Sequence, residues 1–349
     1  MTVTPPIGRD PSRLAALADD LARLAGRSAV EGPWESGAFG CLARHGVLAA
    51  FVPRDCGGSG DGEADLLTAL VEIGETCLTT ALALTQWAAA VRVIAGAPDD
   101  VRSMLLPPLA RGDTRTTVGI SQLTTSRRHL ARPALVATRD ADGWRLDGTC
   151  PWVTGADACD TIVTGAATDD GGQMYFVVPT AAAGVTIDPP LAMLALSGSR
   201  TTAVHFAATR PAHAIAPAGT GGPRTGGLAT TALAVGATRA SIAAISREAV
   251  SRPALAPIAA GFTTETDAIA ERLTDAARAG IDPADRDRLR ADANGLVVRA
   301  AQAALTASKG AGFVAGHPVE RLVRESLFFL VWSCPQAVAD AVLCDLTAG

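Results

Sequence analysis

The spacing of apolar residues changes twice along this chain of 349 residues, and these changes constrain the fold more than any other feature. Helical spacing dominates at first. Ser12 is a suitable N-cap, and it is followed by leucines at helical intervals, namely Leu14, Leu17, Leu21 and Leu24. Residues 63–94 predict two helices, and residues 98–111 predict a shorter one that ends near Gly112. Residues 1–112 are therefore predicted to form an N-terminal helical domain.

Short β-favouring runs replace the helical pattern from about residue 113. They begin at Thr116, Ala134, Trp144, Thr161, Met174 and Ala203. Asp-Gly, Asp-Asp-Gly-Gly and Pro-Pro turns separate them. Turns at such regular intervals predict a small β-barrel over about residues 113–215, within a central domain of residues 113–217.

Helical spacing returns at about residue 228, after a segment rich in Gly and Pro that predicts a flexible connection. Helices are predicted over 228–251, 263–279, 283–309 and 318–345. In the last of these, one face is apolar and wide enough for a bundle interior; it holds Val319, Leu322, Val323, Leu327, Leu330 and Val331. Residues 218–349 are therefore predicted to be a C-terminal four-helix bundle. The predicted fold class is α+β, with three successive domains.

The composition excludes several classes of partner. The net charge is −5, with 48% apolar and 19% charged residues, and the positive residues are scattered, which argues against nucleic-acid binding. The first residues carry no basic region followed by an apolar run, and no later segment suggests a membrane span. The expectation is a cytoplasmic globular protein without a membrane or nucleic-acid partner.

The cysteines and histidines do not suggest a metal site. Seven cysteines are an odd number, without a Cys-x-x-Cys pair or a histidine at ligand spacing, and the five histidines are dispersed. We therefore expect reduced, mostly buried thiols and no bound metal.

One stretch combines a strand, a glycine turn and an aromatic-hydroxyl pair. It runs from Gly143 to Asp160 and contains Gly148, Trp152 and Thr154. This stretch resembles the flavin-facing β-hairpin of the acyl-CoA dehydrogenase family, whose Trp and Thr lie beside the isoalloxazine ring. An ordinary β-hairpin with a core Trp is the alternative interpretation of this stretch taken alone.

Two further stretches extend the resemblance over nearly the whole chain. Pro53 followed by Gly57-Gly58-Ser-Gly60 is similar to a family loop near the N-terminus. Towards the C-terminus, the segment from Gly310 to Glu325 is similar to the family's glycine turn and its Pro-Val-Glu-Arg-x-x-Arg-Asp motif. Together the three stretches make the family fold the expected one.

The resemblance implies FAD as a possible cofactor and suggests which residues would bind it. Ser121, Trp152 and Thr154 match positions at the flavin ring. On the phosphate side, the family's Gly-Ser turn is replaced by Ser126-Arg127-Arg128, which predicts either a phosphate contact through charge or a solvated basic turn. The other positions implied on the phosphate side are Arg252, Gly310 and Gly312, and the family's equivalent of Arg252 reaches the FAD of a neighbouring subunit.

The catalytic base of the family has no clear equivalent. In most relatives it is a Glu nine residues after the Arg that matches Arg324, and that position is Ser333 here. The alternative register, near Thr225-Gly226-Gly227, also lacks a carboxylate. A Ser hydroxyl has too high a pKa to act as the base without a partner. Ser333 and the nearest carboxylate, Glu325, are therefore weak catalytic candidates, and the catalytic residues stay unassigned.

Three functions are consistent with this pattern. The first is a flavin-dependent oxidoreductase with altered chemistry, either oxidation of an unusual acyl thioester or flavin monooxygenation, which needs no α-proton base. The second is a non-catalytic subunit that completes a hetero-oligomer with a paralogue. The third is a flavin-free protein that binds an acyl group or its carrier. The expected partners are a small-molecule or thioester substrate and further subunits, in a homo-oligomer or a hetero-oligomer.

Overall fold

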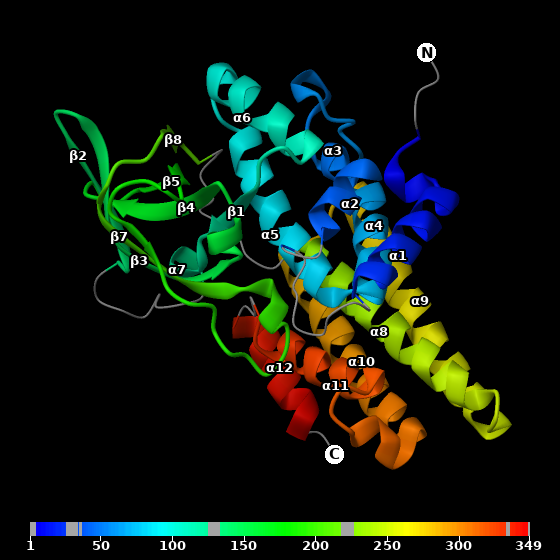
Figure 1. Cartoon of the computed structure of the whole chain (residues 1–349). Coiled ribbons are helices and arrows are strands. Elements are labelled where there is room, and N and C mark those ends of the chain that lie inside the picture. The colour runs from blue at the N-terminus through cyan, green and yellow to red at the C-terminus, as the bar shows by residue number, and fades with distance from the viewer. Residues whose placement is uncertain are drawn as a thin grey trace.

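The computed structural model describes residues 5–25, 34, 37–124, 133–217, 227–332 and 336–347. Its first part is helical, and Figure 1 shows these helices on one side of the molecule and the strands on the other. The helices are α1 (Pro11–Ala25), α2 (Ala38–Arg44), α3 (Val47–Phe51), α4 (Glu63–Thr76), α5 (Leu78–Ala95) and α6 (Asp99–Arg111). The two helices predicted over 63–94 and the shorter one before Gly112 are confirmed.

The strands form one mixed sheet that follows the N-terminal helices. They are β1 (Thr116–Gly119), β2 (Leu135–Asp140), β3 (Gly143–Thr154), β4 (Thr161–Thr168), β5 (Gln173–Pro179), β6 (Val185–Ile187), β7 (Thr201–Thr209) and β8 (His213–Ile215). A short helix, α7 (Ser121–Thr124), follows β1. The hydrogen-bonded order is β6-β7-β3-β2-β4-β5-β8, with β1 parallel to β4.

The predicted central β-domain is present as this sheet, and its hydrogen-bonded order has two ends, β6 and β8. In the described part of the chain, β6 and β8 are only three residues long and each pairs on one side. Buried side chains from five of the strands share one apolar cluster, so the sheet has its own core. That cluster contains Leu135, Leu146, Cys150, Ile162, Phe176, Val178, Val204 and Phe206 as its larger members.

Three long helices make up most of the C-terminal part. They are α8 (Leu228–Ala249), α9 (Ala256–Ala279) and α10 (Pro283–Ser308). Helix α8 packs on α4, α9 and α10, so the N-terminal and C-terminal helices share one continuous core. The helices predicted over 228–251 and 283–309 are confirmed, and α9 begins seven residues earlier than the predicted residue 263.

The single helix predicted over 318–345 is wrong. The structure has α11 (Pro318–Leu327), a 3-10 turn η7 (Phe328–Leu330) and α12 (Gln336–Thr347). Backbone carbonyls that a continuous helix would use are taken by side chains of α10, because Asn294 Nδ2 donates to the Phe329 carbonyl at 2.8 Å and Arg290 donates to the Trp332 carbonyl at 2.6 Å. Pro335, which lies outside the described residues, also lacks the N–H that a helix needs.

Helices α4 and α8 approach closely at a pair of glycines. A Cβ added to Gly236 would lie 2.4 Å from the Val71 carbonyl oxygen and 2.7 Å from the Glu75 backbone nitrogen. At Gly74, on the facing helix, the nearest atoms would be at 3.6 Å. Gly236 is therefore the position that allows this close crossing.

Helices α5 and α8 are long and apolar enough to cross a membrane, which the sequence argument against any such segment missed. Their most apolar windows are 61% and 72% buried inside the molecule, however. Packing in the core therefore accounts for their composition, and this pattern is weak evidence for a membrane span.

Candidate functional site

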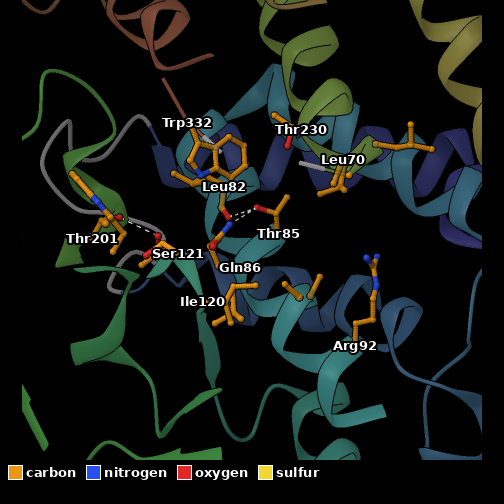
Figure 2. Close-up of a pocket in the computed structure, with 18 of the residues that line it drawn as sticks. Leu70, Leu82, Thr85, Gln86, Arg92, Ile120, Ser121, Thr201, Thr230 and Trp332 are labelled. Atoms are coloured by element: carbon orange, nitrogen blue, oxygen red, sulfur yellow. Dashed lines mark hydrogen bonds between the residues drawn. The ribbon is translucent and has the colours of Figure 1, made fainter. Parts of the chain in front are cut away.

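A cavity of about 390 Å³ lies where the sheet meets both groups of helices. Figure 2 shows it from close by. Its walls come from α4, α5, the β1–α7 segment, β3, β7, the first turn of α8 and η7 with the two residues after it. Its size and mixed lining fall in the range of small-molecule sites.

Trp152 reaches the cavity because β3 contains a bulge. The register with β7 shifts between Cys150 and Val153, so the bulged segment holds Pro151 and Trp152. A bulge changes the direction of a side chain and bends the strand. Cys150 and Val153 stay buried in the sheet core, while the indole of Trp152 is 48% exposed on the cavity wall.

Hydroxyl groups lie next to Trp152 at the ends of β3 and β7. The Thr154 and Thr201 hydroxyl oxygens are 3.0 Å apart, and the Ser199 hydroxyl is 2.9 Å from that of Thr201. Gly155 follows, with φ +65°, and a Cβ there would lie 2.2 Å from the ring of Trp34. Because Gly155 has no side chain, its backbone can contact the indole of Trp34 directly, and this contact fixes the end of β3 against the N-terminal part of the chain.

Ser121 lines the same cavity from the first position of α7. Its neighbour Gln122 is buried and fixes α7, because its amide nitrogen donates to the Gly165 carbonyl at 2.7 Å and its carbonyl oxygen accepts from the Cys150 thiol at 3.0 Å. Burial raises the pKa of the Cys150 thiol to about 12, so this thiol stays protonated as a donor. The structure thus brings together Ser121, Trp152 and Thr154, as the resemblance implies.

Polar groups also stand on the opposite, helical walls. Gln86 of α5 donates from its amide nitrogen to the Thr85 hydroxyl oxygen at 3.1 Å, and the Thr85 hydroxyl donates to the Leu82 carbonyl at 2.7 Å. Thr230, in the first turn of α8, also lines the cavity. Figure 2 shows these side chains around the same space, between apolar ones.

Two stacked aromatic rings close another side. The rings of Phe328 and Trp332 have centroids 4.9 Å apart and an interplanar angle of 18°. The bonds from Asn294 and Arg290 to the backbone of η7 and Trp332 hold this pair in place. Trp332 lines the cavity and directly precedes Ser333, the position at which the resemblance implies the base.

Charged side chains are few around the cavity. Among the described lining residues, the ionisable ones are Glu63 and Arg92, and both are exposed. Glu325 does not line the cavity; it is 8% exposed on α11, with its carboxylate 3.8 Å from Arg321. Burial raises the pKa of Glu325 to about 7, with the two nearby arginines opposing this shift.

Three of the residues expected on the phosphate side, Arg252, Gly310 and Gly312, do not line the cavity. Arg252 follows α8, which extends about 30 Å from the cavity end. It bonds to Glu248 and to the Ala307 carbonyl, close to the 3-10 turn that contains Gly310 and Gly312. One chain therefore brings these three residues near one another but does not bring them to its own cavity.

Several predicted site residues lie outside the described part of the chain. These are Arg127 and Arg128 for the phosphate, and Ser333 and Thr225-Gly226 for the two base registers. Their assignments stay predictions.

One group of side chains of metal-ligand type was not predicted from the sequence. Asp20 of α1 lies within 4.8 Å of Cys41 and of His45, which are one turn apart around α2. His45 Nε2 is 2.8 Å from Asp20, and Arg23 also pairs with that carboxylate. These pairings link α1 to α2.

Sequence reasoning also missed most of the helical wall. Gln86, Thr85 and Thr230 lie in runs of Ala, Leu and Thr that read as ordinary helix. Thr201 had a detectable signal, since it aligns with Thr154 once β3 and β7 are paired. Trp332 had one too, through its place beside the base register.

The comparisons with known proteins agree with this architecture. Residues 15–113 match the model of the acyl-CoA dehydrogenase N-terminal domain. A probable acyl-CoA dehydrogenase of Bacillus subtilis (strain 168), YngJ, is 26% identical over 176 residues, which are 48% of this chain. The matched part spans 45% of that relative, less than half of its length.

Solved structures match over almost the entire length. A glutaryl-CoA dehydrogenase from Mycobacterium smegmatis, solved with FADH2, has a TM-score of 0.78 at 20% identity and covers 98% of this chain and 96% of its own. KijD3, solved with FMN and dTDP-3-amino-2,3,6-trideoxy-4-keto-3-methyl-D-glucose, has a TM-score of 0.79 at 22% identity, over 99% of this chain and 95% of its own. Helices, central sheet and C-terminal helices follow the same order, so this chain has the acyl-CoA dehydrogenase fold.

Proposed function

We propose that this chain is a flavin-dependent oxidoreductase whose reaction does not use a carboxylate base on the substrate's α-carbon. One observation carries the proposal. Trp152, Thr154 and Ser121 share a cavity whose described lining contains no buried carboxylate. Abstraction of an α-proton needs a base within hydrogen-bond reach of that proton, and the exposed Glu63 lies at the helical wall.

The ring side of the cavity fits a flavin. A large exposed indole beside hydroxyl groups offers an aromatic contact and polar edges for a planar heterocycle. Trp152 would contact the flavin ring, and Ser121 and Thr154 would bond to its edge. Bound flavin would supply hydride acceptance or, when reduced, reaction with oxygen. FAD is the cofactor that the family suggests, and two structures of this fold contain FADH2 and FMN.

The protein's own contribution would be shape and exclusion of water. Phe328 and Trp332 would cover one face of the substrate, and the α4 and α5 walls would hold its apolar part. The substrate class is a small molecule or an unusual acyl thioester. Oxidation of such a thioester and flavin monooxygenation are the two reactions that this site suits.

The direct test is a visible spectrum of the purified protein, followed by titration with FAD and with FMN. We expect bound flavin, and an affinity roughly tenfold lower in Trp152→Ala, because the ring contact is lost. If Arg127, Arg128 or Arg252 hold the phosphates by charge, the affinity should also fall with salt. Leu191→Ala, at another partly exposed apolar residue of the sheet domain, serves as the matched control.

The titration also separates the two other functions. Flavin binding only after mixing with a co-encoded paralogue would favour the non-catalytic partner subunit. Absence of binding under every condition would favour a flavin-free protein that binds an acyl group or its carrier. Either result would reject the proposed oxidoreductase.

A further inference from the structure

The helical wall of the cavity carries hydrogen-bonding groups that a plain acyl chain would not use. Gln86 and Thr230 stand on it, from α5 and α8, among Leu70, Leu82 and Phe328. We propose that the ligand carries a hydroxyl or amino group on the part that enters this wall, and that Gln86 and Thr230 select it. This rests on the proposed function insofar as the cavity is taken as the substrate site.

The orientation of the Gln86 amide follows from its neighbour. The Thr85 hydroxyl donates its one hydrogen to the Leu82 carbonyl, so its oxygen can only accept from Gln86. The amide nitrogen of Gln86 must therefore face Thr85, since the reverse orientation would place two acceptors together. One N–H and the carbonyl oxygen of Gln86 then have no partner in the described part of the chain.

Thr230 is available for a related reason. Thr238 and Ser241, farther along the same helix, donate to carbonyls four residues earlier, at 2.8 and 3.1 Å. Thr230 lies in the first turn, where no helical carbonyl precedes it at that distance in sequence. It is 4% exposed, and within the residues that the structure describes its hydroxyl makes no hydrogen bond.

These groups would discriminate between ligands, because an apolar ligand would leave them without hydrogen bonds. A saturated chain against this wall would remove water from the Gln86 amide and give no hydrogen bond in return, and an unsatisfied buried polar group is costly. A hydroxyl at that depth would donate to the Gln86 oxygen and accept from Thr230 or the Gln86 N–H, and an ammonium group would donate to the Gln86 and Thr230 oxygens. Sites built around such bonds reject analogues that lack the polar group far more strongly than apolar pockets reject an extra one.

The experiment compares matched thioesters. Binding of octanoyl-CoA and of its 3-, 5- and 7-hydroxy derivatives is measured by calorimetry and by tryptophan fluorescence, because Trp152 and Trp332 both line the cavity. The wild-type protein should bind at least one hydroxy derivative tenfold or more tightly than octanoyl-CoA. Gln86→Met, of similar length, and Thr230→Val, of similar shape, should each reduce that preference several-fold.

The control is Gln302→Met, which makes the same change at an exposed position of α10. It should leave the preference unchanged, and thermal unfolding of all variants checks that they fold. Equal or tighter binding of octanoyl-CoA by the wild type would overturn the inference. So would a preference that survives both cavity substitutions, or failure of the whole panel to bind.

Flavin binding is followed separately by its visible absorption. If flavin does not bind but the hydroxy preference exists and depends on Gln86, the proposed oxidoreductase fails and the ligand class stands. If flavin binds and no such preference exists, only the ligand class fails.

Discussion

For the carboxyl group of Glu325, position in the fold decides between a catalytic and a structural role. It lies on α11, one turn before Phe328, and it is buried without lining the cavity. Its raised pKa, about 7, would suit a general base, yet a base must also reach the substrate. Its nearest charged partner is Arg321, which favours a structural role.

The raised pKa of Glu325 predicts a pH dependence of stability. The ordinary value is 4.5 and the folded value about 7, so the folded state binds this proton more tightly than the unfolded state. The free energy of unfolding should then fall as the pH rises from about 4.5 to 7, by about 3 kcal/mol at most. Glu325→Gln should remove this slope and be more stable than the wild type at pH 8. Urea unfolding across this range measures it, with Glu320→Gln as the control; equal slopes in wild type and Glu325→Gln would contradict the prediction.

A second prediction concerns the reaction. Anaerobic mixing of the flavin-loaded protein with saturated acyl-CoAs of several lengths should not bleach the flavin, because no described carboxylate reaches the cavity interior. Stopped-flow absorbance records this directly. Rapid bleaching that Glu325→Gln abolishes and Ser333→Ala preserves would identify Glu325 as the base after all.

Residue-level features were only partly predictable from the sequence. Trp152 and Thr154 form a motif within one strand, so a local resemblance sufficed to find them. The direction of Trp152 depends on a bulge opposite β7, which needs the pairing register. Gln86 and Thr230 are 144 positions apart in the sequence, and only the packing of α5, α8 and η7 shows that they share a cavity.

At the scale of elements, the crossing of α4 and α8 determines two walls of the cavity. Leu66, Leu67 and Leu70 line it from α4, and residues of the first turn line it from α8. Helical periodicity predicts that both helices exist, because each has a repeating apolar face. It does not predict their separation, which is set by the small residue at the contact.

Substitutions at the two glycines test this crossing. Gly236→Ala should lower the free energy of unfolding by about 1–3 kcal/mol, because its Cβ would overlap the α4 backbone. Gly74→Ala should be neutral or stabilise by up to about 1 kcal/mol, since ordinary contact distances are available and Ala favours helix. Chemical denaturation of both variants measures the difference. Equal effects of the two substitutions would show that the close approach at Gly236 does not limit the packing.

The position at which a helix breaks was harder to predict from the sequence than the presence of the helix. The helical pattern continues through residues 318–345 because its apolar face continues, while the break after α11 depends on Arg290 and Asn294 of another helix. Likewise, regularly spaced turns predict many strands, but they do not predict which strands lie at the two edges of the sheet.

On the scale of the whole molecule, the end opposite the cavity exposes apolar side chains. Val250 is 87% exposed and Phe313 81%, next to Val314 and near Arg252. Because the resemblance assigns Arg252 to a neighbour's flavin, we expect this end to contact a second copy of the chain or a paralogue.

The oligomeric state tests this expectation. Sedimentation should give a mass of two or more chains, and Phe313→Asp should reduce it, because a charge at the contact would lose its hydration. Leu343→Asp, an exposed apolar residue on α12, is the matched control. A wild-type monomer at every concentration, with and without a paralogue, would exclude the expected assembly.

The N-terminal helices, the sheet and the C-terminal helical part each contribute residues to the cavity, from Phe51 to Trp332. Unfolding of any one part therefore removes the site, and a ligand that fills it binds only the intact fold. At a hundred times its dissociation constant such a ligand adds about 2.7 kcal/mol to the free energy of unfolding. Thermal unfolding can therefore be used to screen for ligands. A rise in the melting temperature would identify flavin or substrate in a library of compounds before any turnover is known.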